Sequence, residues 1–227
     1  MANMLLVMGS SGGGKSTSIR TLDPKTTCIF QVVKKDLPFK GWKKMYTLYS
    51  TDKGGNLVQP SNWENLCNAM KHISAKCPHI KTFVIDDVQY VMGLEFMARG
   101  MEKGYDKFSE IGMHMMEVIN TPSKLRSDLT VVFLSHTEEI TTNAGLLTKM
   151  KTLGKMLDSN ITLEGLFAIV LIACGYTGSK DKEMRHVFIT QSNGSTTAKS
   201  PMGMFEREIP NDLQLVLTKM EQYYEGE

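Results

Sequence analysis

The sequence predicts an α/β domain with a central, mostly parallel sheet, helices on both faces of the sheet, and a β-hairpin in the C-terminal part. Short apolar runs of strand length recur along the chain and alternate with stretches of helical periodicity. These runs are apolar at nearly every position, which is typical of strands buried on both faces of a parallel sheet. At 227 residues, with 41% hydrophobic and 22% charged residues, the chain suits one domain covering residues 1–227.

The predicted strands are bounded by turn or polar residues, and in chain order they are Met4–Met8, Cys28–Val33, Thr82–Ile85, Thr130–Leu134, Phe167–Cys174 and Arg185–Thr190. We expect the last two to pair as an antiparallel hairpin across the polar turn Thr177–Lys182. The predicted helices are Lys15–Leu22, Trp63–Ser74, Val88–Met97 and Asn211–Tyr224. Asn211 or Asp212 is the expected cap of the last helix. Two long segments with weak patterning, Gly93–Gly112 and Glu138–Leu163, are expected to be functional or mobile loops.

Charge and hydropathy exclude several classes of protein. Lys and Arg exceed Asp and Glu by only two, so no global positive field indicates nucleic-acid or membrane binding, and any such binding must be local. No apolar run approaches the roughly 18 residues of a membrane span. The first strand-like run leads directly into a glycine loop, without the features of a secretory signal. We therefore expect a cytosolic protein that does not cross a membrane.

A glycine-rich loop follows the first predicted strand. From Gly9 to Ser16 the chain matches the pattern G-x-x-x-x-G-K-[S/T] at every fixed position. An apolar strand precedes the loop and a helix-compatible stretch begins at Lys15, which is the strand, loop and helix order that this motif requires. The alternative, a flexible Gly/Ser loop that happens to precede a lysine, explains the order less well. The sequence predicts a nucleotide phosphate site.

The chemistry of the site follows from the residue types in the loop. Glycines let backbone N–H groups turn toward phosphate oxygens, and the following helix adds its positive N-terminal end. We expect Lys15 to bridge the β- and γ-phosphates, Ser16 to hold Mg²⁺, and Thr17 to lie on the α-phosphate side. The expected cofactors are ATP and Mg²⁺. The expected nucleotide-binding residues are Gly9, Ser10, Ser11, Gly12, Gly13, Gly14, Lys15, Ser16 and Thr17.

Two carboxylates follow the third predicted strand. A buried strand that ends in a carboxylate is the usual second element of a P-loop site, and Asp86 is therefore the predicted Mg²⁺ partner of Ser16. Asp87 has two interpretations that the sequence leaves open. It either positions the attacking water or caps the helix that begins at Val88.

The strand Thr130–Leu134 ends in Ser135 and His136. In P-loop ATPases a polar residue at this strand end can sense the γ-phosphate, so both residues are candidates. A structural role for His136 is the equally weighted alternative.

These three strand ends carry a resemblance to a known family. The glycine loop, the Asp86 strand end and the His136 strand end occur in the order found in small phage-encoded RecA-core ATPases, and a hairpin-like pair follows them. The chain resembles the Sak group of single-strand annealing proteins, which are related to Rad-type recombinases. The resemblance implies a RecA-like P-loop NTPase fold and an ATP-dependent protein that oligomerises on single-stranded DNA and promotes annealing or strand exchange. It further implies location in the bacterial host cytosol and a single-stranded-DNA-binding protein as partner.

The resemblance also implies an ATP site at the interface between subunits, to which a neighbour contributes a basic residue. By its position after the last strands, Lys199 is the candidate, and a solvated loop lysine is the alternative. The family has a catalytic glutamate near the end of the second strand, whereas this chain continues into Lys34, Lys35 and Asp36. Either Asp36 or Asp87 takes that role, or hydrolysis is slow.

Three segments are candidates for DNA contact. Lys34–Tyr46 interleaves five lysines with Phe39, Trp42 and Tyr46, a composition that suits phosphate neutralisation and base stacking but also suits a solvated loop. The other two, Thr148–Lys155 and Gly93–Lys107, lie where RecA-like proteins place DNA-binding loops. The latter carries Arg99, Lys103 and Lys107.

Three alternatives share the glycine loop. In the first, ATP gates self-assembly and annealing, and its hydrolysis is incidental. The second is a nucleotide kinase, which should carry an arginine-rich lid that this chain lacks, because its five arginines are widely spread. The third is a helicase-loader ATPase, which would share every motif named above.

Overall fold

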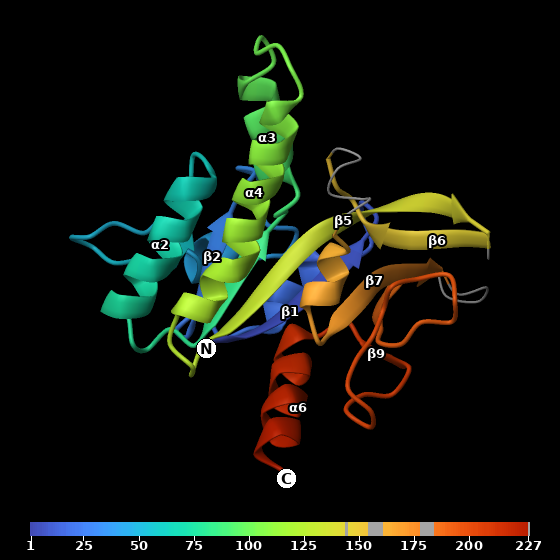
Figure 1. Ribbon diagram of the computed structural model, residues 1–227. Coiled ribbons are helices and arrows are strands. Elements are labelled where there is room, and N and C mark those ends of the chain that lie inside the picture. Colours follow the sequence, from blue (N-terminus) through green and yellow to red (C-terminus); the bar gives the residue numbers. More distant parts are fainter. Residues whose placement is uncertain (144, 154–160, 178–183, 227) are drawn as a thin grey trace.

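The computed structural model describes residues 1–143, 145–153, 161–177 and 184–226 (Figure 1). Strands and helices alternate along most of the chain. The strands are β1 (Asn3–Gly9), β2 (Thr27–Gln31), β3 (Leu57–Val58), β4 (Thr82–Asp86), β5 (Thr130–Thr142), β6 (Gly145–Met150), β7 (Val170–Thr177), β8 (Met184–Ile189) and β9 (Glu208–Pro210). The α-helices are α1 (Trp42–Met45), α2 (Trp63–Lys76), α3 (Tyr90–Ala98), α4 (Asp106–Asn120) and α6 (Leu213–Glu225). Short 3₁₀ helices are η1 (Ser16–Thr21), η2 (Thr121–Lys124) and η3 (Leu163–Leu166).

The described residues form a nine-strand sheet in the order β3-β2-β4-β5-β1-β7-β8-β9, with β6 paired to β5 outside this path. The strands from β3 to β7 in this order are parallel, and β8, β9 and β6 pair antiparallel. The strand β5 lies between β1, which leads into the glycine loop, and β4, which ends at Asp86. The predicted mostly parallel sheet and the predicted β7–β8 hairpin are confirmed. Residues 178–182 of the expected turn lie outside the described residues.

Both faces of the sheet are covered, which explains why its strands read as continuous apolar runs. On β1, Leu6 and Met8 pack into the core on one face, and Leu5 and Val7 pack into the core on the other. Helices α2, α3 and α4 bury apolar residues in the first core, while η1 and α6 do so in the second. The arrangement is the mixed α/β fold of a P-loop NTPase, with helices on both sides of the sheet (Figure 1).

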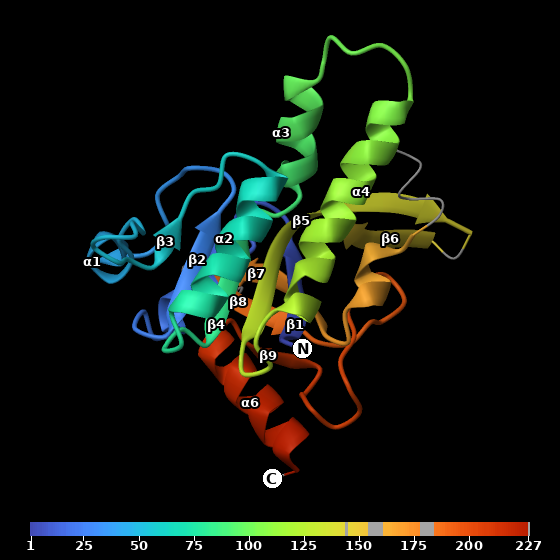
Figure 2. The same cartoon turned by 60° about the vertical axis from the view of Figure 1, so that its left-hand side comes forward.

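The two long segments expected to be loops contain regular structure. Helices α3 and α4 form a hairpin that projects beyond the sheet, and the Gly93–Gly112 segment lies mostly within it (Figure 2). The weak patterning has a physical cause, because the buried residues of α4 begin only at Ile111. In the Glu138–Leu163 segment, β5 continues to Thr142 and pairs with β6. Polar side chains along this exposed ribbon hide its strand character.

The structure makes two helix predictions more definite. The predicted helix Lys15–Leu22 is the six-residue 3₁₀ helix η1. At the C-terminal helix α6, Asp212 is the cap, since its side chain accepts a hydrogen bond from the backbone N–H of Leu215 at 2.9 Å. Asn211 instead turns toward the glycine loop.

Within the described part of the chain, no helix is long and apolar enough to cross a membrane.

Candidate active site

The glycine loop is packed tightly against three later parts of the chain. The β7 backbone lies so close that a Cβ added to Gly13 would stand 2.7 Å from the carbonyl oxygen of Ala173. Gly14 has a φ of 97°, and a Cβ there would meet the ring of His186 at 2.8 Å. The side chain of Asn211 donates a hydrogen bond to the Gly14 carbonyl at 3.2 Å. Glycine is therefore required at Gly13 by space, and at Gly14 by space and backbone conformation together.

Lys15 is 5% exposed, and its ammonium turns back on its own loop. Nζ donates hydrogen bonds to the carbonyl oxygens of Gly9 at 2.8 Å and Ser10 at 2.9 Å. Burial lowers the pKa of Lys15 to about 8. The ammonium is held at the mouth of the loop, where an anionic phosphate would be its partner.

A cavity of about 210 Å³ opens in front of the loop. It brings together residues from the glycine loop, the segment after β2, and the ends of β4 and β5. Its lining residues are Ser11, Gly12, Gly14, Lys15, Ser16, Thr17, Lys35, Asp36, Pro38, Asp87 and His136. Of the nine residues expected to bind nucleotide, six line this cavity. Of the other three, Gly9 and Gly13 pack against the backbone of Ala173, and the Ser10 carbonyl holds Lys15.

Asp86 lies at the end of β4 and is completely buried. The Ser16 hydroxyl donates a hydrogen bond to Asp86 Oδ1 at 2.8 Å. Asp86 Oδ2 has no hydrogen-bond partner among the described residues. Burial, reinforced by the nearby charge of Asp87, raises the pKa of Asp86 to about 6. A hydroxyl and a buried carboxylate, one oxygen of which accepts no hydrogen bond from the described residues, form a donor set that fits Mg²⁺, which prefers oxygen ligands.

Asp87 has a left-handed backbone, with a φ of 62°, and is the one such non-glycine residue in the described ranges. Its carboxylate forms an ion pair with Lys35, and its Oδ1 lies 3.4 Å from Nε2 of His136. The helix-cap interpretation of Asp87 is wrong, because α3 begins at Tyr90 after Gln89, without a side-chain cap. The left-handed turn points the carboxylate into the cavity instead.

His136 lies on β5 and lines the cavity, whereas Ser135 is fully buried and donates a hydrogen bond to the His136 carbonyl. Burial, with a further contribution from the charge of Lys15, lowers the pKa of His136. Its backbone N–H donates to the side chain of Gln89 at 3.2 Å. Of the two polar residues proposed at this strand end, only His136 faces the phosphate cavity.

Lys35 lies beside the two carboxylates, a position that was not predicted from the sequence. Its ammonium reaches the carboxylate of Asp87 and lies 3.9 Å from Asp86 Oδ2. Burial opposes the charged form, but the charges of Asp86 and Asp87 outweigh it and raise the pKa of Lys35. Asp36 also lines the cavity, yet its side chain is 74% exposed and pairs with Lys43 at 3.4 Å. The signal that could have identified Lys35 as a site residue was a lysine shortly after β2, a strand of the P-loop sheet.

Lys199 lies away from the phosphate cavity of its own chain. Its backbone forms a bridge with Val170 at the start of β7, with hydrogen bonds of 2.8 Å and 2.9 Å. The Lys199 ammonium is not among the groups that line the cavity.

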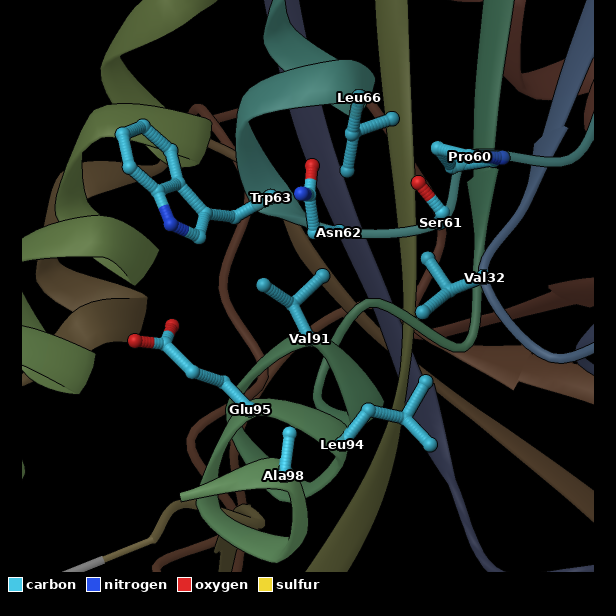
Figure 3. Close-up of a pocket in the computed structure, with 10 residues that line it drawn as sticks. All are labelled: Val32, Pro60, Ser61, Asn62, Trp63, Leu66, Val91, Leu94, Glu95 and Ala98. Atoms are coloured by element: carbon cyan, nitrogen blue, oxygen red, sulfur yellow. The ribbon is translucent and has the colours of Figure 1, made fainter. Parts of the chain in front are cut away.

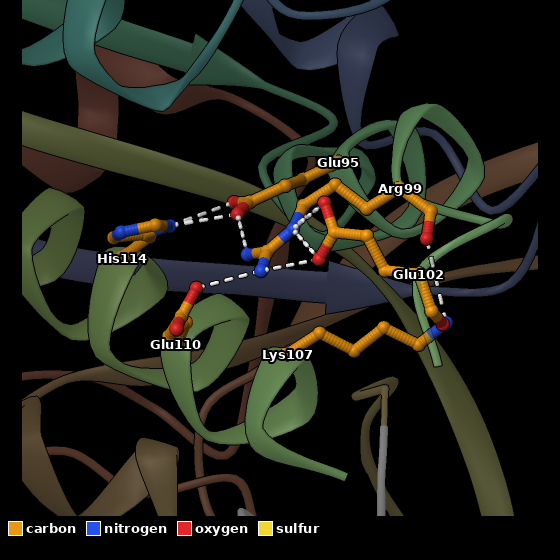
Figure 4. Close-up of polar contacts among 6 residues, drawn as sticks. All are labelled: Glu95, Arg99, Glu102, Lys107, Glu110 and His114. Carbon is orange, nitrogen blue, oxygen red and sulfur yellow. Dashed lines mark hydrogen bonds and ion pairs between the residues drawn. The ribbon is translucent and has the colours of Figure 1, made fainter. Parts of the chain in front are cut away.

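Two cations of the Gly93–Lys107 segment, Arg99 and Lys107, are engaged with protein groups (Figure 4). The Arg99 guanidinium contacts the carboxylates of Glu95, Glu102 and Glu110 at 2.6–3.1 Å. The Lys107 ammonium donates to the Glu102 carbonyl at 2.7 Å. Carboxylates and carbonyl oxygens already hold the Arg99 and Lys107 donors, and DNA contact by this segment stays a prediction.

The Lys34–Tyr46 segment is folded around a hollow of about 580 Å³, lined by residues 36–44. The Lys43 ammonium lies 5.4 Å from the centre of the Trp42 ring. Phe39 and Trp42 are half-buried against the second core, while Tyr46 is 1% exposed. Tyr46 is therefore a core residue, unavailable for base stacking, while Phe39 and Trp42 are partly exposed.

In the Thr148–Lys155 segment, Thr148–Met150 belong to β6, and residues 154 and 155 lie outside the described residues.

A separate hollow of about 230 Å³ opens between the start of α2 and α3, with Trp63 and Glu95 on one side and Leu94 on another (Figure 3). Trp63 stacks on His114, with ring centres 4.1 Å apart.

Comparison with known proteins agrees with this geometry. A search of curated proteins returned no match to the chain. The family model described as an AAA domain matches residues 1–202, and the phosphate cavity lies entirely within that range. This match indicates nucleotide binding and hydrolysis. The chain therefore belongs to the AAA domain family of P-loop ATPases.

Proposed function

We propose that this protein is a Mg²⁺-dependent ATPase of RecA type that acts in phage recombination. The observation that supports the ATPase part is that Lys15, Ser16 and Asp87 line one cavity, with the buried Asp86 hydrogen-bonded to Ser16 behind it. Lys15 would leave its loop carbonyls for the β- and γ-phosphates, and Ser16 and Asp86 would hold the metal ion. Bound Mg²⁺ would neutralise phosphate charge during transfer.

Asp87 and His136 act on the side of the attacking water. Asp87 accepts a proton from water as the water oxygen bonds to the γ-phosphorus and the bond to ADP breaks. His136, 3.4 Å from Asp87, fixes the carboxylate and faces the phosphate. The left-handed backbone of Asp87 supports this assignment, since strained conformations of non-glycine residues persist where the surroundings hold them.

The DNA part of the proposal rests on the hollow of the Lys34–Tyr46 segment. It adjoins the phosphate cavity through Asp36 and Pro38, which line both. Exposed lysines with accessible Phe39 and Trp42 provide phosphate neutralisation and a stacking surface for single-stranded DNA. The protein would oligomerise on this strand with ATP at subunit interfaces, Lys199 reaching the neighbour's nucleotide. A single-stranded-DNA-binding protein is its proposed partner.

The test is the rate of Mg-ATP hydrolysis with and without single-stranded DNA, with Lys15→Ala as the blank. Stimulation by DNA supports the recombination proposal. A flat rate with ATP and DNA both bound favours an annealing protein in which ATP gates assembly. Hydrolysis without any DNA binding refutes the recombination part and favours the kinase or helicase-loader alternatives.

A further inference from the structure

Two adjacent carboxylates lie buried at the end of β4. The Asp86 side chain is fully buried and that of Asp87 is 3% exposed. Two like charges this close, away from water, repel each other strongly and need a positive partner. Among the described cations, Lys35 is the one in ion-pair contact with both carboxylates.

The other cations of the cavity are differently engaged. The Lys15 ammonium is bonded to the carbonyl oxygens of Gly9 and Ser10. His136 approaches only Asp87, at 3.4 Å. Lys35 is therefore the main counter-ion of the carboxylate pair in the arrangement seen here.

The backbone of Lys35 is fixed while its side chain has room to move. Gln31, a fully buried residue of β2, donates a hydrogen bond to the Lys35 carbonyl at 2.6 Å. Gln59 in turn donates to the Gln31 side chain at 3.0 Å. The Lys35 side chain is 38% exposed and lines the phosphate cavity, so its flexible stem can carry the ammonium away from the carboxylates without moving the chain.

We propose that the Lys35 ammonium occupies the place of the divalent cation when the site is empty. The ammonium must move away from Asp86 before the cation can reach that carboxylate. The oxygen concerned is Asp86 Oδ2, which has no hydrogen-bond partner among the described residues and lies 3.9 Å from the ammonium. A divalent ion at that oxygen and an ammonium beside it would repel each other. The displaced ammonium remains in the cavity, where nucleotide phosphates offer it another anionic partner. Lys35 thereby offsets part of the negative charge of the empty site and makes cation binding dependent on nucleotide.

This inference rests on the proposed role of Asp86 as a cation ligand, and its test needs no hydrolysis. Mn²⁺ binding to the whole protein without nucleotide is measured by electron paramagnetic resonance. Lys35→Gln should bind Mn²⁺ about tenfold more tightly than wild type, because a competing charge is gone. Lys35→Arg should bind like wild type, and Lys25→Gln, which removes an exposed lysine elsewhere, controls for net charge.

A second readout is thermal unfolding. In EDTA, Lys35→Gln should unfold about 3 °C or more below wild type, because the carboxylates lose their partner. Adding Mn²⁺ should restore most of that loss while changing wild type little.

The outcomes separate the two proposals. Equal Mn²⁺ affinity and equal unfolding temperature in wild type and Lys35→Gln overturn the role of Lys35. A Lys35→Gln protein that fails to fold in EDTA but folds with Mn²⁺ supports the role of Lys35. If Lys35→Gln fails to fold in both conditions and Lys35→Arg fails as well, the proposed role is overturned. If Asp86→Asn leaves the Mn²⁺ affinity of the Lys35→Gln protein unchanged, the proposed metal site itself is wrong.

Discussion

The hydroxyl of Ser16 donates a hydrogen bond to the buried carboxylate of Asp86 across 70 residues of sequence. This bond joins the end of the glycine loop to the end of β4, although β5 separates β4 from β1 in the sheet. It orients one carboxylate oxygen toward the loop and leaves the other without a hydrogen-bond partner among the described residues. The two groups proposed to hold Mg²⁺ are thus in position without the ion.

Replacing Lys15 with alanine should weaken ATP binding at least about tenfold, because a charge-assisted contact with phosphate is lost. The fold should remain, with an unfolding temperature within about 3 °C of wild type. Burial of the ammonium already lowers its pKa to about 8, so its removal relieves a desolvation cost. Calorimetric titration with ATP and circular dichroism check both statements, with Lys25→Ala as the control. Full ATP binding by Lys15→Ala would contradict the phosphate-site assignment.

Asp86 should make stability depend on pH. Its pKa is about 6 in the fold against 3.8 as a free side chain, so the folded state favours the protonated form. The resulting stabilisation is complete below pH 3.8 and disappears as the pH rises through 6. In EDTA at pH 8, Asp86→Asn should unfold about 5 °C above wild type.

Thermal scans of both proteins from pH 4 to pH 8 test this sign. The advantage of Asp86→Asn should shrink steadily below pH 6. A constant difference across the range would mean that Asp86 does not titrate as its burial requires.

Lys199 can be tested by mixing variants. If it acts on a neighbour's nucleotide, Lys199→Ala should reduce hydrolysis only in oligomers. Mixed with Lys15→Ala, it should recover part of the activity, because one variant supplies an intact phosphate loop and the other an intact Lys199. Hydrolysis assays at several mixing ratios measure the recovery. Strict additivity of the two separate rates would exclude action between subunits.

Trp42→Ala should weaken single-stranded DNA binding about tenfold through loss of base stacking. Fluorescence anisotropy with a labelled oligonucleotide at fixed salt measures the change. The matched control is Arg99→Ala, whose guanidinium is committed to three carboxylates and should leave the affinity unaltered. If Arg99→Ala weakened DNA binding and Trp42→Ala did not, the DNA site would be assigned to the α3–α4 hairpin instead.

The sequence predicts the sheet well because its strands are buried on both faces and therefore apolar throughout. The β7–β8 hairpin and the position of Asp86 at a strand end follow from the same pattern. The ribbon formed by β5 and β6 could not be predicted in this way, because much of it is exposed and carries Glu138, Glu139 and several threonines. Solvent-facing strands lack the apolar signal on which the prediction depends.

For the candidate site, a motif reveals local neighbours but not partners brought together by folding. The glycine loop predicts the cavity wall from Ser11 to Thr17 directly. Asp87 and His136 could be assigned to the same phosphate site because each follows a predicted strand, but nothing in the spacing indicates that Lys35, four residues after β2, joins them. The helix-cap interpretation of Asp87 failed for a related reason, since a left-handed φ cannot be read from residue type alone.

The residues that pack against the glycine loop are translated long after the loop itself. Gly13 rests on the backbone of Ala173, and Gly14 accepts a hydrogen bond from Asn211, 197 residues later in the chain. At translation rates of about 5–20 residues per second, the loop waits roughly 10–40 s on the ribosome before its last wall emerges. The first motif to be translated is among the last to take its final shape, and a nascent chain that stops before Ala173 carries the signature without the site.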